Sequence, residues 1–122
     1  MSITDLNGPS VVLLVRDEQE AVQYYTNLGF RYESIGGHAH VSLGKVTFIL
    51  HPAKEPGDVR PQSAVSGLYF DVFCYTGELR ALYDQLVAQG VTISNGPHFG
   101  EGWSEFTIED LNGYRIAFGG GL

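Results

Sequence analysis

The feature that most constrains this 122-residue chain is an internal repeat of predicted elements. Each half is predicted to form a strand, a helix and three more strands, in that order. In the first half the strands fall at 11–15, 30–35, 39–43 and 46–51, with the helix after the first strand. In the second half they fall at 68–74, 91–94, 103–109 and 114–118, with the helix in the same place. Because two separate halves agree, the order is better supported than any single element.

Capping signals and apolar periodicity define the two helices. Asp17 and Glu20 form an Asp variant of the capping box, and Thr76 can cap the second helix. Gly29 and Gly90 supply the stop signals. Apolar residues recur at helical spacing in both stretches: Ala21, Val22, Tyr25 and Leu28 in the first, and Leu79, Leu82, Tyr83, Leu86 and Val87 in the second.

The two modules, at about 9–51 and 67–119, are joined by a segment rich in proline and glycine. We interpret residues 52–66 as a linker without regular structure, because prolines and glycine interrupt it at 52, 56, 57 and 61. The glycines at 119–121 suggest a frayed tail. The chain is therefore expected to form one α+β domain over residues 1–122, built from two βαβββ modules.

Composition excludes several classes of function. The formal net charge is −7, with 14 acidic and seven basic residues, which argues against nucleic acid as a partner. No apolar run is long enough to span a membrane, and no signal peptide is evident, so we expect a cytoplasmic protein. Cys74 is the only cysteine, which rules out an internal disulfide and a thiolate zinc site. We interpret it as a small buried apolar residue.

Four sequence segments carry a family resemblance. They are residues 12–17 (VLLVRD), 21–25 (AVQYY), 28–30 (LGF) and 105–116 (EFTIEDLNGYRI). In their order and spacing they resemble the glyoxalase/bleomycin resistance/extradiol dioxygenase superfamily, also called vicinal oxygen chelate. Leu111 replaces the usual proline of the last turn, and Asn112 replaces its second aspartate.

The resemblance implies an incomplete barrel-like sheet that curls around a cavity. It also implies pairing as a homodimer, with sites at the shared interface, while leaving open whether the chains exchange elements. The bleomycin-resistance branch binds its drug without chemistry. Other branches use a divalent metal held by His and Glu side chains from four strands. Fold alone does not choose between these activities.

The two faces of the predicted sheet differ in character, because side chains alternate along a strand. One face is apolar and should be the core beneath the helices: Val11, Leu13, Val15, Val46, Phe48, Leu50, Leu68, Phe70, Val72, Ile116 and Phe118. The opposite face mixes apolar and polar residues, as a ligand cavity does: Ser10, Val12, Leu14, Thr47, Ile49, His51, Gly67, Tyr69, Asp71, Phe73, Arg115, Ala117 and Gly119.

The usual metal-ligand positions of the superfamily match Ser10, Ile49, Gly67 and Ala117. None is His, Glu or Asp, so we expect no metal at that site and no cofactor. A two-residue shift on the fourth strand would place His51 there instead. His38 and His40 could hold a metal in a non-standard way, although an exposed hairpin is the simpler interpretation.

The glycine-rich loop 96–103 contains His98, Phe99 and Trp103, which are typical of contact residues. Tyr69 and Trp103 could sandwich a planar ligand by offset stacking. Asp71 and Arg115 could pair or orient the ligand. The candidate ligand-binding residues are Val12, Leu14, Ile49, His51, Tyr69, Asp71, His98, Trp103 and Arg115.

These residues favour metal-independent binding of a small, partly aromatic molecule, as in antibiotic sequestration of the bleomycin-resistance type. The alternative is a glyoxalase-like lyase or isomerase, or a dioxygenase-related enzyme, with a non-standard active site; no catalytic residue can be named for it. A third possibility is a protein-interaction dimer without a small ligand. The sequence does not identify the ligand.

Overall fold

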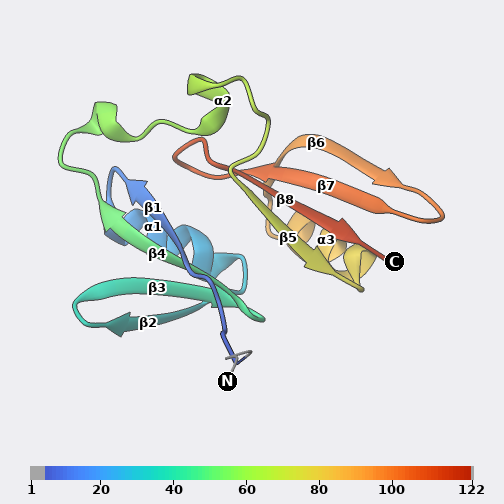
Figure 1. Ribbon diagram of the computed structural model, residues 1–122, viewed down its shortest axis with the longest axis horizontal. Coiled ribbons are helices and arrows are strands. Elements are labelled where there is room, and N and C mark those ends of the chain that lie inside the picture. The colour runs from blue at the N-terminus through green and yellow to red at the C-terminus, as the bar shows by residue number, and fades with distance from the viewer. Residues whose placement is uncertain (1–4, 122) are drawn as a thin grey trace. The chain divides into compact units, whose positions relative to one another are not determined.

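The computed structural model describes residues 5–121 and has the predicted α+β fold of two βαβββ modules (Figure 1). Contacts within the chain divide it into two compact units, Met1–Lys54 and Glu55–Leu122. Each unit contains one four-stranded mixed sheet and one long helix against it. The repeat predicted from the sequence is therefore present in the structure. No helix in the described part of the chain is long and apolar enough to cross a membrane.

The first unit follows the predicted order. Its elements are β1 (Val11–Val15), α1 (Glu18–Asn27), β2 (Arg31–Ile35), β3 (His38–Leu43) and β4 (Val46–Pro52). The strand order in the sheet is β1-β4-β3-β2, with β1 parallel to β4 and the other pairs antiparallel. The connection from β1 to β4 passes through α1, β2 and β3, because parallel strands need a long crossover connection.

The core of this unit lies between α1 and one face of its sheet. Tyr25 is fully buried, and its ring meets those of Phe30 and Phe48 edge-on, at centroid distances of 5.1 and 5.6 Å. The predicted core residues Leu13, Val15, Phe48 and Leu50 are all buried. The helix begins as predicted, because the Asp17 carboxylate accepts a 2.9 Å hydrogen bond from the Glu20 amide.

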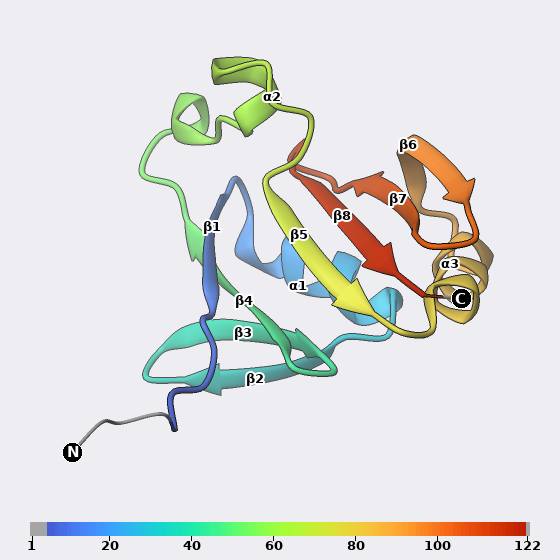
Figure 2. The ribbon, with the colours of Figure 1, turned by 45° about the vertical axis from the view of Figure 1, so that its right-hand side comes forward.

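The second unit repeats this plan after two short helical segments. Its elements are a 3-10 turn (Pro56–Asp58), α2 (Gln62–Val65), β5 (Val72–Thr76), α3 (Leu79–Ala88), β6 (Thr92–Phe99), β7 (Ser104–Glu109) and β8 (Arg115–Gly120). Figure 2 shows α3 on one side of this sheet, where it contacts β7 and β8. The strand order is β5-β8-β7-β6, with β5 parallel to β8.

Equivalent registers in the two sheets define which residues correspond. Val12 pairs with Ile49 across β1 and β4, and Phe73 pairs with Ala117 across β5 and β8. Asp71 therefore precedes β5 in the same way that Ser10 precedes β1. The prediction that Gly67 occupies this position is wrong, because β5 begins at Val72 and Gly67 lies in the connection before it.

The same shift corrects the predicted strand at 68–74. Only the last residues of this stretch, from Val72 on, belong to the sheet, because the pairing of Val72 with Ile116 sets the register. Leu68 is consequently 45% exposed instead of being buried. The linker was expected to lack regular structure, and this is also wrong. Pro56 is the first residue of the 3-10 turn and Pro61 is the N-cap of α2, and proline is tolerated at the start of a helix because its missing N–H has no partner there.

The C-terminal glycines are not a frayed tail. β8 runs to Gly120, and Gly119 pairs with Tyr75 on one side and Glu105 on the other. Gly120 has φ +145°, and a Cβ there would collide with the Thr76 carbonyl oxygen. Glycine is therefore required at this position in the sheet.

Candidate ligand-binding site

The most distinctive side chains of the second unit are two aromatic rings stacked over a glycine. Phe73 of β5 and Trp103, just before β7, lie with ring centroids 6.2 Å apart and ring planes at 23°. Both rings cover Gly119 of β8. A Cβ on Gly119 would lie 2.8 Å from Phe73 and would collide with the Trp103 indole. The absence of a side chain at Gly119 therefore creates the space in which the two rings pack.

Three further rings extend this cluster on the face of the sheet opposite α3. Tyr75 lies 5.2 Å from Phe73 and 6.5 Å from Trp103, and its plane makes an angle of 64° with the indole. Phe70 meets Phe73 edge-on at 5.5 Å, and Tyr69 meets Phe70 at 5.2 Å. We call these five residues the aromatic face.

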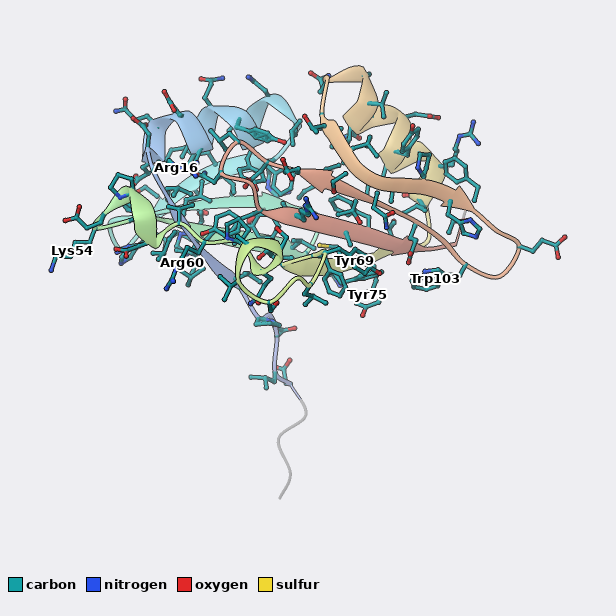
Figure 3. All side chains as sticks on the ribbon, turned by 90° about the horizontal axis from the view of Figure 1, so that it is seen from above. Arg16, Lys54, Arg60, Tyr69, Tyr75 and Trp103 are labelled. Atoms are coloured by element: carbon teal, nitrogen blue, oxygen red, sulfur yellow. The ribbon has the colours of Figure 1, made fainter. Side chains whose placement is uncertain are left out.

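Much of the aromatic face is open to solvent. Tyr75 is 76% exposed, Tyr69 45% and Trp103 43%, while Phe70 and Phe73 are partly buried beneath them. Figure 3 shows Tyr69, Tyr75 and Trp103 along the same side of the second unit. Contiguous exposed aromatic surface of this kind typically marks a contact site for a ligand or partner.

A hydrogen bond holds the indole in place. The Trp103 Nε1–H donates to the Glu105 carboxylate at 2.9 Å. Trp103 and Glu105 are two residues apart along an extended chain, so their side chains leave on the same side. Glu105 therefore limits rotation of the indole and brings a carboxylate to the edge of the aromatic face.

Asp71 has a structural role that was not predicted from the sequence. Its two carboxylate oxygens accept hydrogen bonds from backbone amides of Gln62 at 2.7 Å and Arg115 at 2.8 Å. The Arg115 guanidinium does not pair with Asp71; its Nε lies 3.1 Å from Glu109. Asp71 thus joins α2 to the start of β8. Of the two roles considered for Asp71 and Arg115, the side-chain pair does not form.

The usual metal-ligand positions of the superfamily carry few suitable donors in this chain. With the corrected register they are Ser10, Ile49, Asp71 and Ala117, which offer one hydroxyl and one carboxylate that already accepts two amides. Within residues 5–121, no group of three or more His, Cys, Asp or Glu side chains is placed to hold a metal ion. The superfamily's metal therefore does not fit the residues found at these positions.

The remaining predicted site residues divide between the two units. In the first unit, Val12 is opposite Ile49 and Leu14 is opposite His51, on the sheet face away from α1. In the second, His98 lies on β6 across from Glu105. Val12, His51 and His98 are exposed, whereas Leu14 and Ile49 are partly buried.

Four members of this arrangement were not among the predicted site residues: Phe70, Phe73, Tyr75 and Glu105. Alternation along the strand had placed Phe73 on the mixed face, and the same alternation continued by two residues would have found Tyr75. Tyr75 was missed because the strand was predicted to end at Cys74. Cys74 itself is buried as expected, and burial raises the pKa of its thiol to about 11, which removes it as a nucleophile.

Comparison with known proteins identifies the family of this chain. The sequence matches the Glyoxalase/Bleomycin resistance protein/Dioxygenase superfamily over residues 9–118. No curated protein is significantly similar to the chain. Among solved structures, an integron cassette protein from the mobile metagenome of V. cholerae is 25% identical, with a TM-score of 0.66 over 98% of this chain and 96% of that chain.

Two other structures share the fold at lower identity. TioX from Micromonospora sp. ML1 is 22% identical, with a TM-score of 0.68 over 94% of this chain and 100% of that chain. TnmS3, an antibiotic binding protein from Streptomyces sp. CB03234, is 17% identical, with a TM-score of 0.67 over 96% and 97%. The family match covers both βαβββ modules, and the chain belongs to the Glyoxalase/Bleomycin resistance protein/Dioxygenase superfamily.

Proposed function

We propose that this protein binds a small, partly aromatic molecule on the aromatic face, without a metal and without changing it chemically. The observation that carries the proposal is the Phe73–Trp103 stack over Gly119, with Tyr75 inclined at 64° beside it. A planar ligand could stack on the exposed indole while its edge meets the Tyr75 ring. Aromatic pairs in such offset or edge-to-face arrangements gain about 0.5–1.5 kcal/mol beyond area burial.

The Trp103 indole that would contact the ligand is already held in place. Glu105 orients the indole of Trp103, and Phe73 supports it from one side. Aromatic side chains have few rotatable bonds, so fixing them on binding costs little entropy. This preorganisation favours binding, because affinity depends on the ordering cost as well as on the area buried.

Independence of metal is supported by the residues at the superfamily's ligand positions. Ser10, Ile49 and Ala117 offer no charged donor, and the carboxylate of Asp71 is engaged by two backbone amides.

The negative charge of the protein favours a neutral or cationic ligand. Residues 55–122 contain nine acidic and three basic side chains, so this part of the sequence carries most of the negative charge.

We further propose that the ligand is an antibiotic that the protein sequesters, acting as a homodimer of single-domain chains. TnmS3, which shares the fold, is an antibiotic binding protein. Each sheet has two edge strands, β1 and β2 in one and β5 and β6 in the other. Pairing of chains about a two-fold axis is the commonest way of covering such edges.

A lyase or isomerase remains the second candidate because one carboxylate borders the aromatic face. Glu105 could accept a proton from a ligand stacked on Trp103, although its present partner is the indole N–H. Incubating ligand with protein and following the ligand by NMR separates the two functions. Unchanged ligand at stoichiometric protein supports sequestration, and conversion that Glu105→Gln abolishes supports the enzyme.

The single tryptophan makes a direct search for the ligand possible, since all indole fluorescence comes from Trp103. Bleomycin and a panel of planar aromatic antibiotics would be titrated into protein purified without a histidine tag, in the presence of EDTA. The proposal predicts saturable quenching by at least one planar compound. Absence of quenching by every compound, or quenching that requires added metal, would contradict it.

A further inference from the structure

Two histidines lie side by side on the sheet of the first unit, on neighbouring strands. Ala39 of β3 pairs with Leu50 of β4, so the antiparallel register places His38 directly across from His51. The two imidazole rings have centroids 5.7 Å apart and planes at 40°. Both side chains are exposed and lie on the face away from α1, where a dissolved ion can reach them.

A third histidine, His40, also lies on β3, and a backbone contact fixes which of its ring nitrogens carries the proton. His40 Nδ1 lies 3.1 Å from the backbone carbonyl oxygen of His38. A carbonyl oxygen can only accept, so Nδ1 carries the proton and Nε2 keeps its lone pair. Metal-binding histidines commonly have this orientation. Glu33 of β2 pairs across from His40 and adds a negative charge to the same region of the sheet.

We propose that His38 and His51 bind a hydrated divalent transition-metal ion, such as Zn²⁺ or Cu²⁺. Imidazole nitrogen is a preferred ligand of both ions. With metal–nitrogen bonds of about 2.0–2.1 Å and a tetrahedral angle, two coordinated imidazoles have centroids about 5 Å apart. The observed centroid separation of 5.7 Å is close to that value.

This site differs from the one whose metal the superfamily uses. Of the usual positions, Ser10 and Ile49 belong to the first unit, and neither offers an imidazole or a carboxylate. The His38–His51 pair instead joins β3 to β4. Because both residues are on paired strands, the backbone holds them together before the metal arrives. The ligand binding proposed for the aromatic face does not depend on it.

The test uses Zn²⁺ and Cu²⁺ themselves, with protein purified without a histidine tag. Zn²⁺ affinity would be measured by competition with a chromogenic chelator, and Cu²⁺ ligation by electron paramagnetic resonance. We expect one ion per chain and imidazole nitrogen couplings in the Cu²⁺ spectrum. His38→Ala and His51→Ala should each weaken Zn²⁺ binding at least about tenfold, since loss of even an outer-shell partner has an effect of this size.

His98→Ala is the matched control, because His98 is an exposed histidine on β6 of the second unit. It should leave the Zn²⁺ affinity unchanged, and His40→Ala should weaken it less than either variant of the pair. All four side chains are exposed or partly exposed, and circular dichroism would verify folding. Equal affinity in His38→Ala, His51→Ala and the wild type would overturn the proposal. So would a loss that is largest in His40→Ala or in His98→Ala.

Discussion

The indole of Trp103 lies over Gly119, and no side chain larger than hydrogen fits beneath it. The glycine is in the last strand of the sheet, paired between Tyr75 and Glu105. An aromatic surface on the sheet thus depends on a residue that contributes no side chain of its own.

Gly119→Ala should displace the rings without preventing folding, since the backbone φ of Gly119 lies outside the range that requires glycine. We expect a loss of about 1–3 kcal/mol in the free energy of unfolding, as is typical of overpacking. Urea denaturation followed by circular dichroism measures the loss, and the emission maximum of Trp103 should also shift. Gly102→Ala is the control, because a Cβ there meets nothing within 4 Å. Equal effects of the two variants would contradict the packing described.

Glu105→Ala should release the indole, whereas Glu105→Gln keeps an oxygen that can accept from Nε1. We expect lower fluorescence anisotropy of Trp103 in Glu105→Ala than in Glu105→Gln, and weaker ligand binding in the same order. The stability change should be about 1 kcal/mol or less, because the bond is exposed to solvent. Identical anisotropy in the two variants would mean that Glu105 does not position the ring.

Asp71→Ala should destabilise the second unit by removing an acceptor from two backbone amides. We expect a loss of about 2 kcal/mol in the free energy of unfolding, given the strength of hydrogen bonds to charged groups and the partial exposure of the site. Asp84→Ala, at an exposed position on α3, should cost much less. If Asp71→Ala instead abolished ligand binding and left stability unchanged, Asp71 would be a ligand contact.

Cys74 should make stability depend on pH in the alkaline range. Below pH 9 its thiol is neutral in the folded and the unfolded chain, so it adds no pH dependence. Burial raises the pKa from 9.0 to about 11 in the folded state, so between these values only the unfolded chain ionises and stability falls as pH rises.

The total fall from Cys74 should approach about 2–3 kcal/mol, since one pKa unit corresponds to about 1.36 kcal/mol. Comparing urea denaturation of wild type and Cys74→Ala at pH 8 and pH 10.5 isolates it from tyrosine and lysine titration. The variant should show the smaller decline. A thiol reagent at pH 8 should also react with Cys74 only after unfolding. Rapid labelling of the folded protein would show that the thiol is accessible.

Much of the fold follows from local sequence signals. The capping pair Asp17 and Glu20 marks the start of α1, and periodic apolar residues identify both long helices. Strand alternation identified the buried Phe48 and Phe118. The predictions failed where pairing with a distant strand decides the outcome. β5 starts at Val72 because of its register with β8. β6 continues through Pro97 because an edge strand with irregular register tolerates a missing N–H.

The candidate site was only partly predictable for the same reason. Trp103 and Tyr69 were identified as exposed aromatic residues, and both belong to the aromatic face. Tyr75 was missed because the end of its strand was misplaced, and Glu105 was missed because its role is a contact with Trp103. Gly119 was placed on the mixed face of the last strand and also in a frayed tail, and a glycine-rich terminus gives no sign that two rings cover it.

Calorimetric titration of the ligand found by fluorescence, with EDTA present, tests metal-independent binding on the aromatic face most directly. Wild type would be compared with Tyr75→Ala and with Tyr32→Ala, which removes a 50% exposed tyrosine from β2 of the first unit. We predict saturable binding without metal, a loss of about tenfold or more in Tyr75→Ala, as expected for a central aromatic contact, and unchanged affinity in Tyr32→Ala. Binding that EDTA abolishes, or that Tyr75→Ala leaves intact, would contradict the account.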